Sequence, residues 1–252
     1  MTVRWIEVGP WRIHTRVLEP AVPAPSRRAD VVLVHGLGMS GRYLVPTQEL
    51  LAADVRVLAP DLPGYGRSTR PDRPLTLTQL ADALVAWLDA TGLQRVALLG
   101  HSLGCQVAAL VADRHPGRVS CLVLASPSGD PGVRGPWRQV LRLLADAPRE
   151  HPGLVPIAVV DYLRARPTRM WATLRESMRP DATGRLALPR QPTLVLRGEH
   201  DPVASAQWVR RLAELLPDGE LVTVPGTAHG LVYTSPEAMA AAVRPFLAAR
   251  GA

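Results

Sequence analysis

Short apolar, β-branched runs alternate along this chain with longer segments in which apolar residues recur every three or four positions. The first pattern predicts strands and the second predicts helices, and their alternation predicts an α/β fold with a mostly parallel sheet and helices on both faces. Two runs separated only by Gly9 and Pro10 predict an antiparallel hairpin at one edge. The expected sheet has eight strands, over residues 3–8, 12–18, 31–34, 55–59, 95–99, 120–125, 193–197 and 220–224.

Four sheet-covering helices are expected between and after these strands. The first follows Thr76, which has with Gln79 the spacing of a capping box. The last is entered through Ser235 as the expected N-cap, with Pro236 at the first helical position. The other two are expected over residues 103–114 and 204–216.

The alternation stops between residues 127 and 189. This stretch has helical patterns over 137–145, 156–164 and 168–178, separated by prolines and arginines. Because a strand pattern resumes at residue 193, we interpret residues 127–189 as a helical lid, or cap, inserted between the sixth and seventh strands. Residues 1–126 and 190–252 then form one core domain, a size that α/β folds often reach.

Composition excludes several classes of protein. The formal charge is +7, but all 29 basic residues are arginine. Residues 134–190 hold 11 arginines and five acidic residues, so most of the excess lies in the expected lid. A basic surface attracts anions in general, and without a stacking platform or a helix-turn-helix pattern no nucleic-acid partner is expected.

No apolar signal segment and no membrane-spanning run are recognisable, so a cytoplasmic protein without a membrane partner is expected. The two cysteines, Cys105 and Cys121, are too few for a disulfide framework or a zinc cluster. Both are expected to be buried and reduced.

The stretch Gly100-His101-Ser102-Leu103-Gly104 lies between an apolar strand pattern and a helical one. It is a G-x-S-x-G sequence in the context of a nucleophile elbow, a sharp strand-to-helix turn that holds a serine in a strained conformation. The two glycines leave room for the reversal of the chain. Free N–H groups at the helix start favour negative charge beside the serine. The pattern predicts a nucleophile at Ser102.

A serine nucleophile requires a base and an orienting acid. Asp201 follows the strand in "LVLRGEHD", and His229 follows the strand in "LVTVPGTAH". Both lie, like Ser102, beyond the carboxyl end of a strand, where open α/β sheets place their ligand sites. We therefore predict a catalytic triad of Ser102, Asp201 and His229.

One further aspartate and three further histidines have positions that could suit the acid or the base. Asp130, after the sixth strand, is an alternative acid. His101 beside the nucleophile is expected to pack beneath the loop, His200 beside Asp201 to be a turn residue, and His35 to hydrogen-bond within a loop scaffold.

The chain order of serine, aspartate and histidine resembles the α/β-hydrolase fold superfamily, from the first hairpin to the last helix. "VVLVHGLGMSG" resembles its HG loop, and the resemblance implies that the backbone N–H groups of Leu37 and Leu103 form the oxyanion hole. "APDLPGYGRS" is similar to the family's D-x-x-G-x-G-x-S turn, in which Gly64 and Gly66 allow a tight loop. The family also inserts its cap between the sixth and seventh strands.

Within the superfamily the chain resembles lid-bearing serine esterases. The resemblance implies an enzyme that cleaves an ester, or a related carbonyl substrate, through an acyl-enzyme without a metal or organic cofactor. Carbon–carbon bond hydrolases of vinylogous diketones, thioesterases, other biosynthetic enzymes, peptidases that remove N-terminal proline and non-catalytic binding proteins remain alternatives, because fold alone does not separate them.

The lid residues suggest the character of a small-molecule substrate. Trp137, Tyr162 and Trp171, with Met170 and Met178, are expected to form an apolar roof over it. The arginine surplus adds the hypothesis that the substrate, or a carrier that bears it, is anionic.

Overall fold

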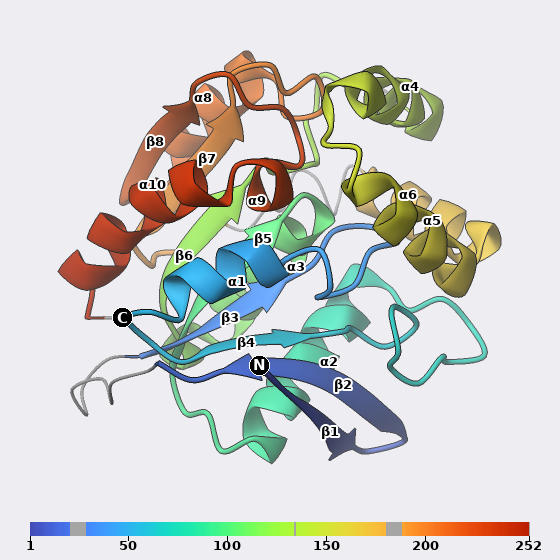
Figure 1. Ribbon diagram of the computed structural model, residues 1–252, viewed down its shortest axis with the longest axis vertical. Helices are drawn as coiled ribbons and strands as arrows, with labels where there is room; N and C mark the ends of the chain where they lie inside the picture. Colours follow the sequence, from blue (N-terminus) through green and yellow to red (C-terminus); the bar gives the residue numbers. More distant parts are fainter. Residues whose placement is uncertain (21–28, 134, 180–187, 252) are drawn as a thin grey trace.

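The computed structural model describes residues 1–20, 29–133, 135–179 and 188–251. Its central feature is an eight-stranded sheet with the order β1-β2-β4-β3-β5-β6-β7-β8 (Figure 1). The strands are β1 (Thr2–Val8), β2 (Trp11–Leu18), β3 (Asp30–Val34), β4 (Val57–Pro60), β5 (Val96–His101), β6 (Val119–Ala125), β7 (Thr193–Gly198) and β8 (Gly219–Val224).

The pairing of the strands confirms the predicted mostly parallel sheet. β1 and β2 form the expected antiparallel hairpin at one edge, and β2 also pairs with β4 in antiparallel register. All later pairs, from β3 with β4 to β7 with β8, are parallel. Two strand ends differ from the prediction by two residues, because β4 begins at Val57 and β5 continues to His101, and the other ends agree to within one residue.

Helices cover both faces of the sheet because its strands are apolar on both sides. Leu33 and Leu99 point to a core shared with α1 and α10, whereas the adjacent Val32 and Leu98 point to a core shared with α2 and α3. α8 packs on the same face as α3. The helices of the core are α1 (Val45–Leu51), α2 (Leu77–Ala90), α3 (Leu103–Arg114), α8 (Ala206–Leu215), α9 (Leu231–Thr234) and α10 (Pro236–Ala249).

Helix starts follow the predicted capping residues in part. Thr76 and Gln79 form both hydrogen bonds of the capping box at α2, and Ser205 caps α8 by accepting from the N–H of Trp208. α10 begins at Pro236 with Ser235 as its N-cap residue, as expected, but the Ser235 side chain makes no capping hydrogen bond. The short helices α1 and α9 were not predicted.

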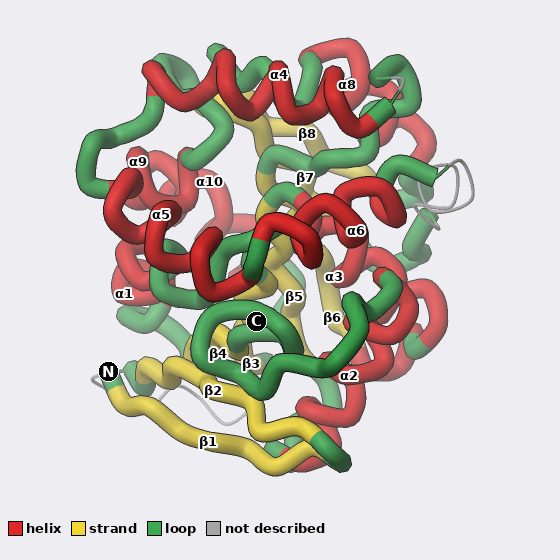
Figure 2. The backbone as a smooth tube through the Cα atoms, turned by 90° about the vertical axis from the view of Figure 1, so that its right-hand side faces the viewer, coloured by secondary structure: helices red, strands yellow, loops and turns green. Residues whose placement is uncertain are grey.

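Between β6 and β7 the described residues form three α-helices, α4 (Pro136–Asp146), α5 (Leu154–Ala165) and α6 (Pro167–Ser177). They lie beyond the carboxyl ends of the parallel strands, with α4 apart from α5 and α6 (Figures 1 and 2). We call α4, α5 and α6 the inserted helices. α5 is fixed to the core by a hydrogen bond of 2.7 Å from Ser40 Oγ to Asp161 Oδ2, and α6 by one of 2.9 Å from the Tyr65 hydroxyl to Thr173 Oγ1. Among the described residues, no helix has both the length and the apolar character needed to cross a membrane.

Candidate active site

The turn between β5 and α3 places Ser102 in a strained conformation. Its φ of 55° and ψ of −119° lie outside the regions that non-glycine residues favour. A Cβ atom at Gly100 would lie 2.5 Å from the Gly104 carbonyl oxygen, and one at Gly104 would lie 2.2 Å from the Val34 carbonyl oxygen. The two glycines therefore allow the reversal, as the sequence predicted. Ser102 precedes the helix, but its side chain makes no capping hydrogen bond and remains free for other partners.

The structure brings together the three residues of the predicted triad. His229 Nε2 lies 3.0 Å from Ser102 Oγ, and His229 Nδ1 lies 3.1 Å from Asp201 Oδ2. The other carboxylate oxygen, Asp201 Oδ1, accepts the backbone N–H groups of Val203 and Ala204. Because a carboxylate only accepts, Nδ1 of His229 donates to Asp201, which leaves Nε2 to accept the Ser102 proton. All three side chains are buried.

The pKa shifts of Asp201 and His229 are consistent with these hydrogen bonds. Burial raises the pKa of Asp201, but the charge and hydrogen bond of His229 outweigh it, and the pKa falls to about 2. Burial lowers the pKa of His229, but the charge and hydrogen bond of Asp201, together with the charges of Asp146 and Glu150, raise it above the usual value. Asp201 is thus ionised at neutral pH and holds the imidazole in one tautomer.

Two carboxyl groups beside His229 were missed by the sequence analysis. Asp146, the last residue of α4, accepts the His229 backbone N–H at 3.1 Å, and Glu150 accepts the Gly230 N–H at 2.6 Å. Burial and then the hydrogen bond and charge of Asp146 raise the pKa of Glu150 to about 8. The two carboxyl groups join the segment that follows β6 to the His229 loop. The only sequence signal was two acidic residues among the arginines of this segment.

The resemblance assigns the oxyanion hole to the backbone N–H groups of Leu37 and Leu103, and both residues lie near Ser102 and His229. Leu37 and Leu103 both line the cavity that contains Ser102 and His229. Within the described ranges, neither backbone N–H donates to a protein acceptor. Leu103 is also the first residue of α3, where the helix dipole favours negative charge. Two free donors are therefore available for a developing oxyanion.

A chain of buried hydrogen bonds, here called the Tyr43–His101 bridge, joins the HG loop to the loop of the base. The Gly36 N–H donates to the Tyr43 oxygen at 2.9 Å, and Tyr43 Oη lies 2.7 Å from His101 Nδ1. His101 Nε2 lies 2.8 Å from the His229 carbonyl oxygen, so Nε2 donates there and Nδ1 accepts from Tyr43. Burial and then the charge of His229 lower the pKa of His101 to about 3, which keeps it neutral. His101 is buried beneath the loop as expected, whereas its contacts with Tyr43 and the His229 loop were not predicted.

The second motif implied by the resemblance forms a support under the HG loop. Asp61 Oδ1 accepts the Gly41 N–H at 2.8 Å and Oδ2 accepts the Arg67 N–H at 3.0 Å. Gly66 has a φ of +53°, and a Cβ there would lie 2.3 Å from Asp61 Oδ2, so the turn requires glycine. His35 is buried and its Nε2 accepts the Leu62 N–H at 2.9 Å, as expected of a scaffold residue.

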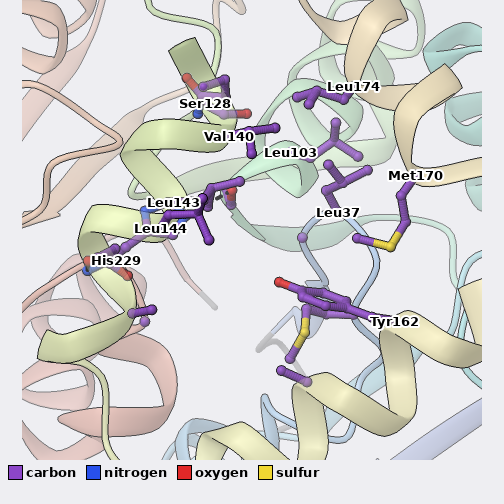
Figure 3. Close-up of a pocket in the computed structure, with 18 of the residues that line it drawn as sticks. Leu37, Leu103, Ser128, Val140, Leu143, Leu144, Tyr162, Met170, Leu174 and His229 are labelled. Atoms are coloured by element: carbon purple, nitrogen blue, oxygen red, sulfur yellow. Dashed lines mark hydrogen bonds between the residues drawn. The ribbon is translucent and has the colours of Figure 1, made fainter. Parts of the chain in front are cut away.

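A cavity of about 590 Å³ extends from Ser102 and His229 between the core and the inserted helices. Figure 3 shows its two sides, with Ser128, Val140, Leu143 and His229 on one and Leu37, Tyr162, Met170 and Leu174 on the other. The first side comes from α4, the loop before it and the loop that carries His229, and the second mainly from the HG loop, α5 and α6. Ser102 therefore opens into a space large enough for a small molecule.

A comparison with known sequence families identifies the family of this chain. A model of the alpha/beta hydrolase family matches residues 31–242. The chain belongs to the alpha/beta hydrolase family. It is accordingly a hydrolase with a small-molecule substrate, and the fold predicted from the motifs is confirmed.

Relatives of this hydrolase include proteins named as a putative carbamate hydrolase and as esterases. The chain is 31% identical over 250 residues to the "Putative carbamate hydrolase RutD" of Caulobacter sp. (strain K31), covering 90% of this chain and 93% of that one. It is 29% identical to a pimeloyl-acyl-carrier-protein methyl ester esterase of Aromatoleum aromaticum, over 83% of this chain and 94% of the relative. A thermophilic esterase of Thermogutta terrifontis, in a malate-bound structure, has the same fold, with a TM-score of 0.82, 24% identity and full coverage of both chains.

The expected apolar roof is present except at one position. Tyr162, Trp171, Met170 and Met178 of the hydrolase line the cavity. Trp137 does not, because its side chain lies on the outside of α4 with 68% of its surface exposed. Its ring packs on that of Trp171, with a centroid separation of 4.7 Å. The expectation that Trp137 contacts substrate is therefore wrong for this arrangement.

The arginine surplus lies outside the cavity. Among the described residues that line the cavity, none is arginine, and two are the carboxyl groups Asp146 and Glu150. Arg142 instead pairs with Asp130, and Arg169 donates to the carbonyl oxygens of Pro71 and Arg73. The cavity itself therefore does not fit the hypothesis of an anionic substrate group held by lid arginines.

The other acid and histidine weighed from the sequence lie outside the triad geometry. Asp130 Oδ2 accepts from Ser205 Oγ at 2.9 Å and from Arg142 at 3.1 Å. The His200 side chain is exposed and lies 3.9 Å from Glu199. It is Asp201 whose carboxylate contacts His229.

Charge at Asp146 is expected to set the acidic limb of the pH profile of the hydrolase. The predicted base, His229, must be neutral to accept a proton, so kcat/KM is expected to fall as pH drops below the pKa of His229. Asp146→Asn keeps an oxygen for the His229 N–H but removes a charge that raises the pKa of His229. We expect the acidic limb of kcat/KM for p-nitrophenyl acetate to move to lower pH in the variant.

The matched control is Asp161→Asn, in which a buried carboxylate bonded to Ser40 is changed at a site that does not act on His229. Its acidic limb should coincide with that of the wild type. An unmoved limb in Asp146→Asn, or a limb moved to higher pH, would contradict the role assigned to the Asp146 charge.

Proposed function

We propose that the chain is a serine hydrolase that cleaves a carboxylic ester through an acyl-enzyme. The observation that carries the proposal is the continuous hydrogen-bond chain from Ser102 through His229 to Asp201 at the floor of the cavity. A serine alone is a poor nucleophile, and this chain supplies the base and the orienting acid that activate it. Residues 127–189 act in this proposal as a cap that encloses the substrate.

The reaction follows from the positions of these groups. His229 Nε2 takes the proton of Ser102 as Oγ attacks the ester carbonyl carbon, and Asp201 stabilises the imidazolium that forms. The tetrahedral oxyanion accepts from the N–H groups of Leu37 and Leu103, each donor contributing about 2.7 to 4 kcal/mol to the transition state. His229 then protonates the departing alkoxide, and the alcohol leaves.

Water completes the cycle. His229, neutral again, removes a proton from water as the oxygen attacks the acyl carbon bound to Ser102, and the same oxyanion donors stabilise the second tetrahedral intermediate. Its collapse releases the carboxylic acid and returns the proton to Ser102. One ester and one water are consumed, and one acid and one alcohol are formed.

A carbamate is the second candidate substrate, supported by the name of the Caulobacter relative, which is 31% identical over 90% of this chain. Attack at a carbamate carbonyl uses the same nucleophile, base and oxyanion donors, and only the leaving group or the acyl group differs. The carbon–carbon, thioester and non-catalytic alternatives have no feature of the cavity that favours them over an ester.

The test combines turnover with trapping of the intermediate. We expect hydrolysis of p-nitrophenyl esters with two to twelve acyl carbons, and rapid quenching followed by peptide mass spectrometry should find the acyl group on Ser102. A p-nitrophenyl carbamate measured in parallel ranks the two substrate classes. A folded protein that hydrolyses none of the esters and forms no adduct at Ser102 refutes the proposed function.

A further inference from the structure

The two walls of the cavity differ in chemistry. On one side α5 and α6 contribute apolar side chains, among them Val159, Met170 and Leu174. On the other side α4 and the segments just before and after it contribute side chains that hydrogen-bond, namely Ser128, Gln139, Asp146 and Glu150. We call this second set the α4 wall. Because α4 also contributes Val140, Leu143 and Leu144, a substrate that fills the cavity meets apolar carbon on both sides and the hydrogen-bonding groups of the α4 wall on one.

Two side chains of the α4 wall are buried without a partner. Gln139 is 4% exposed and Ser128 is 8% exposed. Ser128 Oγ is fully buried without a hydrogen-bond partner among the described residues. The Gln139 side chain makes no hydrogen bond within the part of the chain that the structure describes, and both residues line the cavity. A buried polar group without a partner costs about 1 to 3 kcal/mol, and proteins contain few such groups. Their positions indicate a partner that enters with the ligand.

The periodicity of α4 extends this polar character along the cavity. Gln139 and Asp146 are seven residues apart, which places them on one face of the helix and about 10 Å from each other. Glu150 follows just after the helix and contacts the same loop as Asp146. The α4 wall thus presents amide, hydroxyl and carboxyl oxygens along a line rather than at a single point.

The α4 wall adjoins the reacting groups at both ends. The Ser128 N–H lies 3.5 Å from the Ser102 carbonyl oxygen, and Asp146 accepts the backbone N–H of His229. The leaving group of an ester must lie beside His229, because His229 gives it a proton. The wall nearest His229 is therefore placed to contact the leaving alcohol, which leaves the apolar wall for the acyl group.

We propose that the α4 wall is a binding site for a hydroxylated leaving alcohol, with Gln139 and Ser128 as its first hydrogen-bond partners. Hydroxyl groups both donate and accept, as the amide of Gln139 and the hydroxyl of Ser128 require. The inference rests on the proposed ester hydrolysis and names its substrate class: esters of an apolar acid with an alcohol that carries further hydroxyl groups.

The test uses two esters that differ only in those hydroxyl groups, propyl hexanoate and 2,3-dihydroxypropyl hexanoate. We expect kcat/KM of the wild type to favour the dihydroxypropyl ester by about tenfold, the size of one net hydrogen bond. Gln139→Leu and Ser128→Ala should each remove most of this preference while leaving turnover of propyl hexanoate within about threefold. The preference is compared between wild type and variants, so that the intrinsic reactivity of the two esters cancels.

Val140→Ala provides the matched control on the same wall, since it removes apolar contact but no hydrogen-bonding group. It should change both esters by the same factor. Turnover of both esters without a preference, or a preference that survives in Gln139→Leu and Ser128→Ala, overturns the α4-wall site and leaves the proposed function intact. Absence of turnover on both esters, with no fluorophosphonate adduct at Ser102, refutes the proposed function and this inference with it.

Discussion

Ser102→Ala is expected to lower kcat for p-nitrophenyl ester hydrolysis by about 10⁶-fold, the loss found when the serine of an activated triad is removed. The reason is that the acyl-enzyme can no longer form, so the remaining oxyanion donors and the cavity act only on direct attack by water. The fold should persist, because Ser102 makes no side-chain cap and alanine adds no atom to the turn. Initial rates and a urea unfolding curve measure the two effects separately.

Ser120→Ala serves as the control for this variant. Ser120 belongs to β6, and its hydroxyl has only a weak contact of 3.9 Å with the Cys121 sulfur. Its activity should remain within about twofold of the wild type, as expected for a substitution away from the site. If Ser102→Ala kept more than a tenth of the wild-type kcat, Ser102 would not be the nucleophile.

Asp201→Asn is expected to lower kcat by about 10⁴-fold through the tautomer of His229. An asparagine can place its NH2 group against His229 Nδ1, which then accepts instead of donating. Nε2 then carries the proton and cannot take the one from Ser102. The loss should appear in kcat, while binding of the substrate, which contacts other residues, changes little.

Asp130→Asn tests the alternative acid with the same chemical change. Asp130 contacts Ser205 and Arg142 rather than His229. We expect its kcat to stay within about threefold of the wild type, because no reacting group changes its protonation. A larger loss in Asp130→Asn than in Asp201→Asn would reverse the assignment of the acid. Steady-state kinetics of both variants on one p-nitrophenyl ester decide between the two residues.

The features that the sequence predicted best are those with strong local causes. The alternation of strands and helices follows from apolar periodicity, and the turn at Ser102 follows from glycines that the backbone requires at 100 and 104. The positions of Asp201 and His229 followed from their place after strands. In a parallel sheet such positions gather at one edge, so residues more than one hundred positions apart become neighbours.

The features that were missed depend on tertiary contacts. α1 has no side-chain cap and no acidic residue in its first turn, and it is held by Gln48 Nε2, which donates to the carbonyl oxygens of Arg16 and Val57. Trp137 is aromatic like the residues that line the cavity, but only the orientation of α4 decides that it faces outward. The contacts of Asp146 and Glu150 with the His229 loop join segments about eighty residues apart. No local pattern contains that information.

The Tyr43–His101 bridge determines how the two loops it joins can fluctuate. All its members are buried, so displacement of either loop leaves polar atoms without partners at a cost of about 1 to 3 kcal/mol each. Local opening should therefore be cooperative, with the HG loop and the His229 loop leaving their native positions together rather than singly. Molecules in which only one of these two loops has left its native position are consequently expected to be rare.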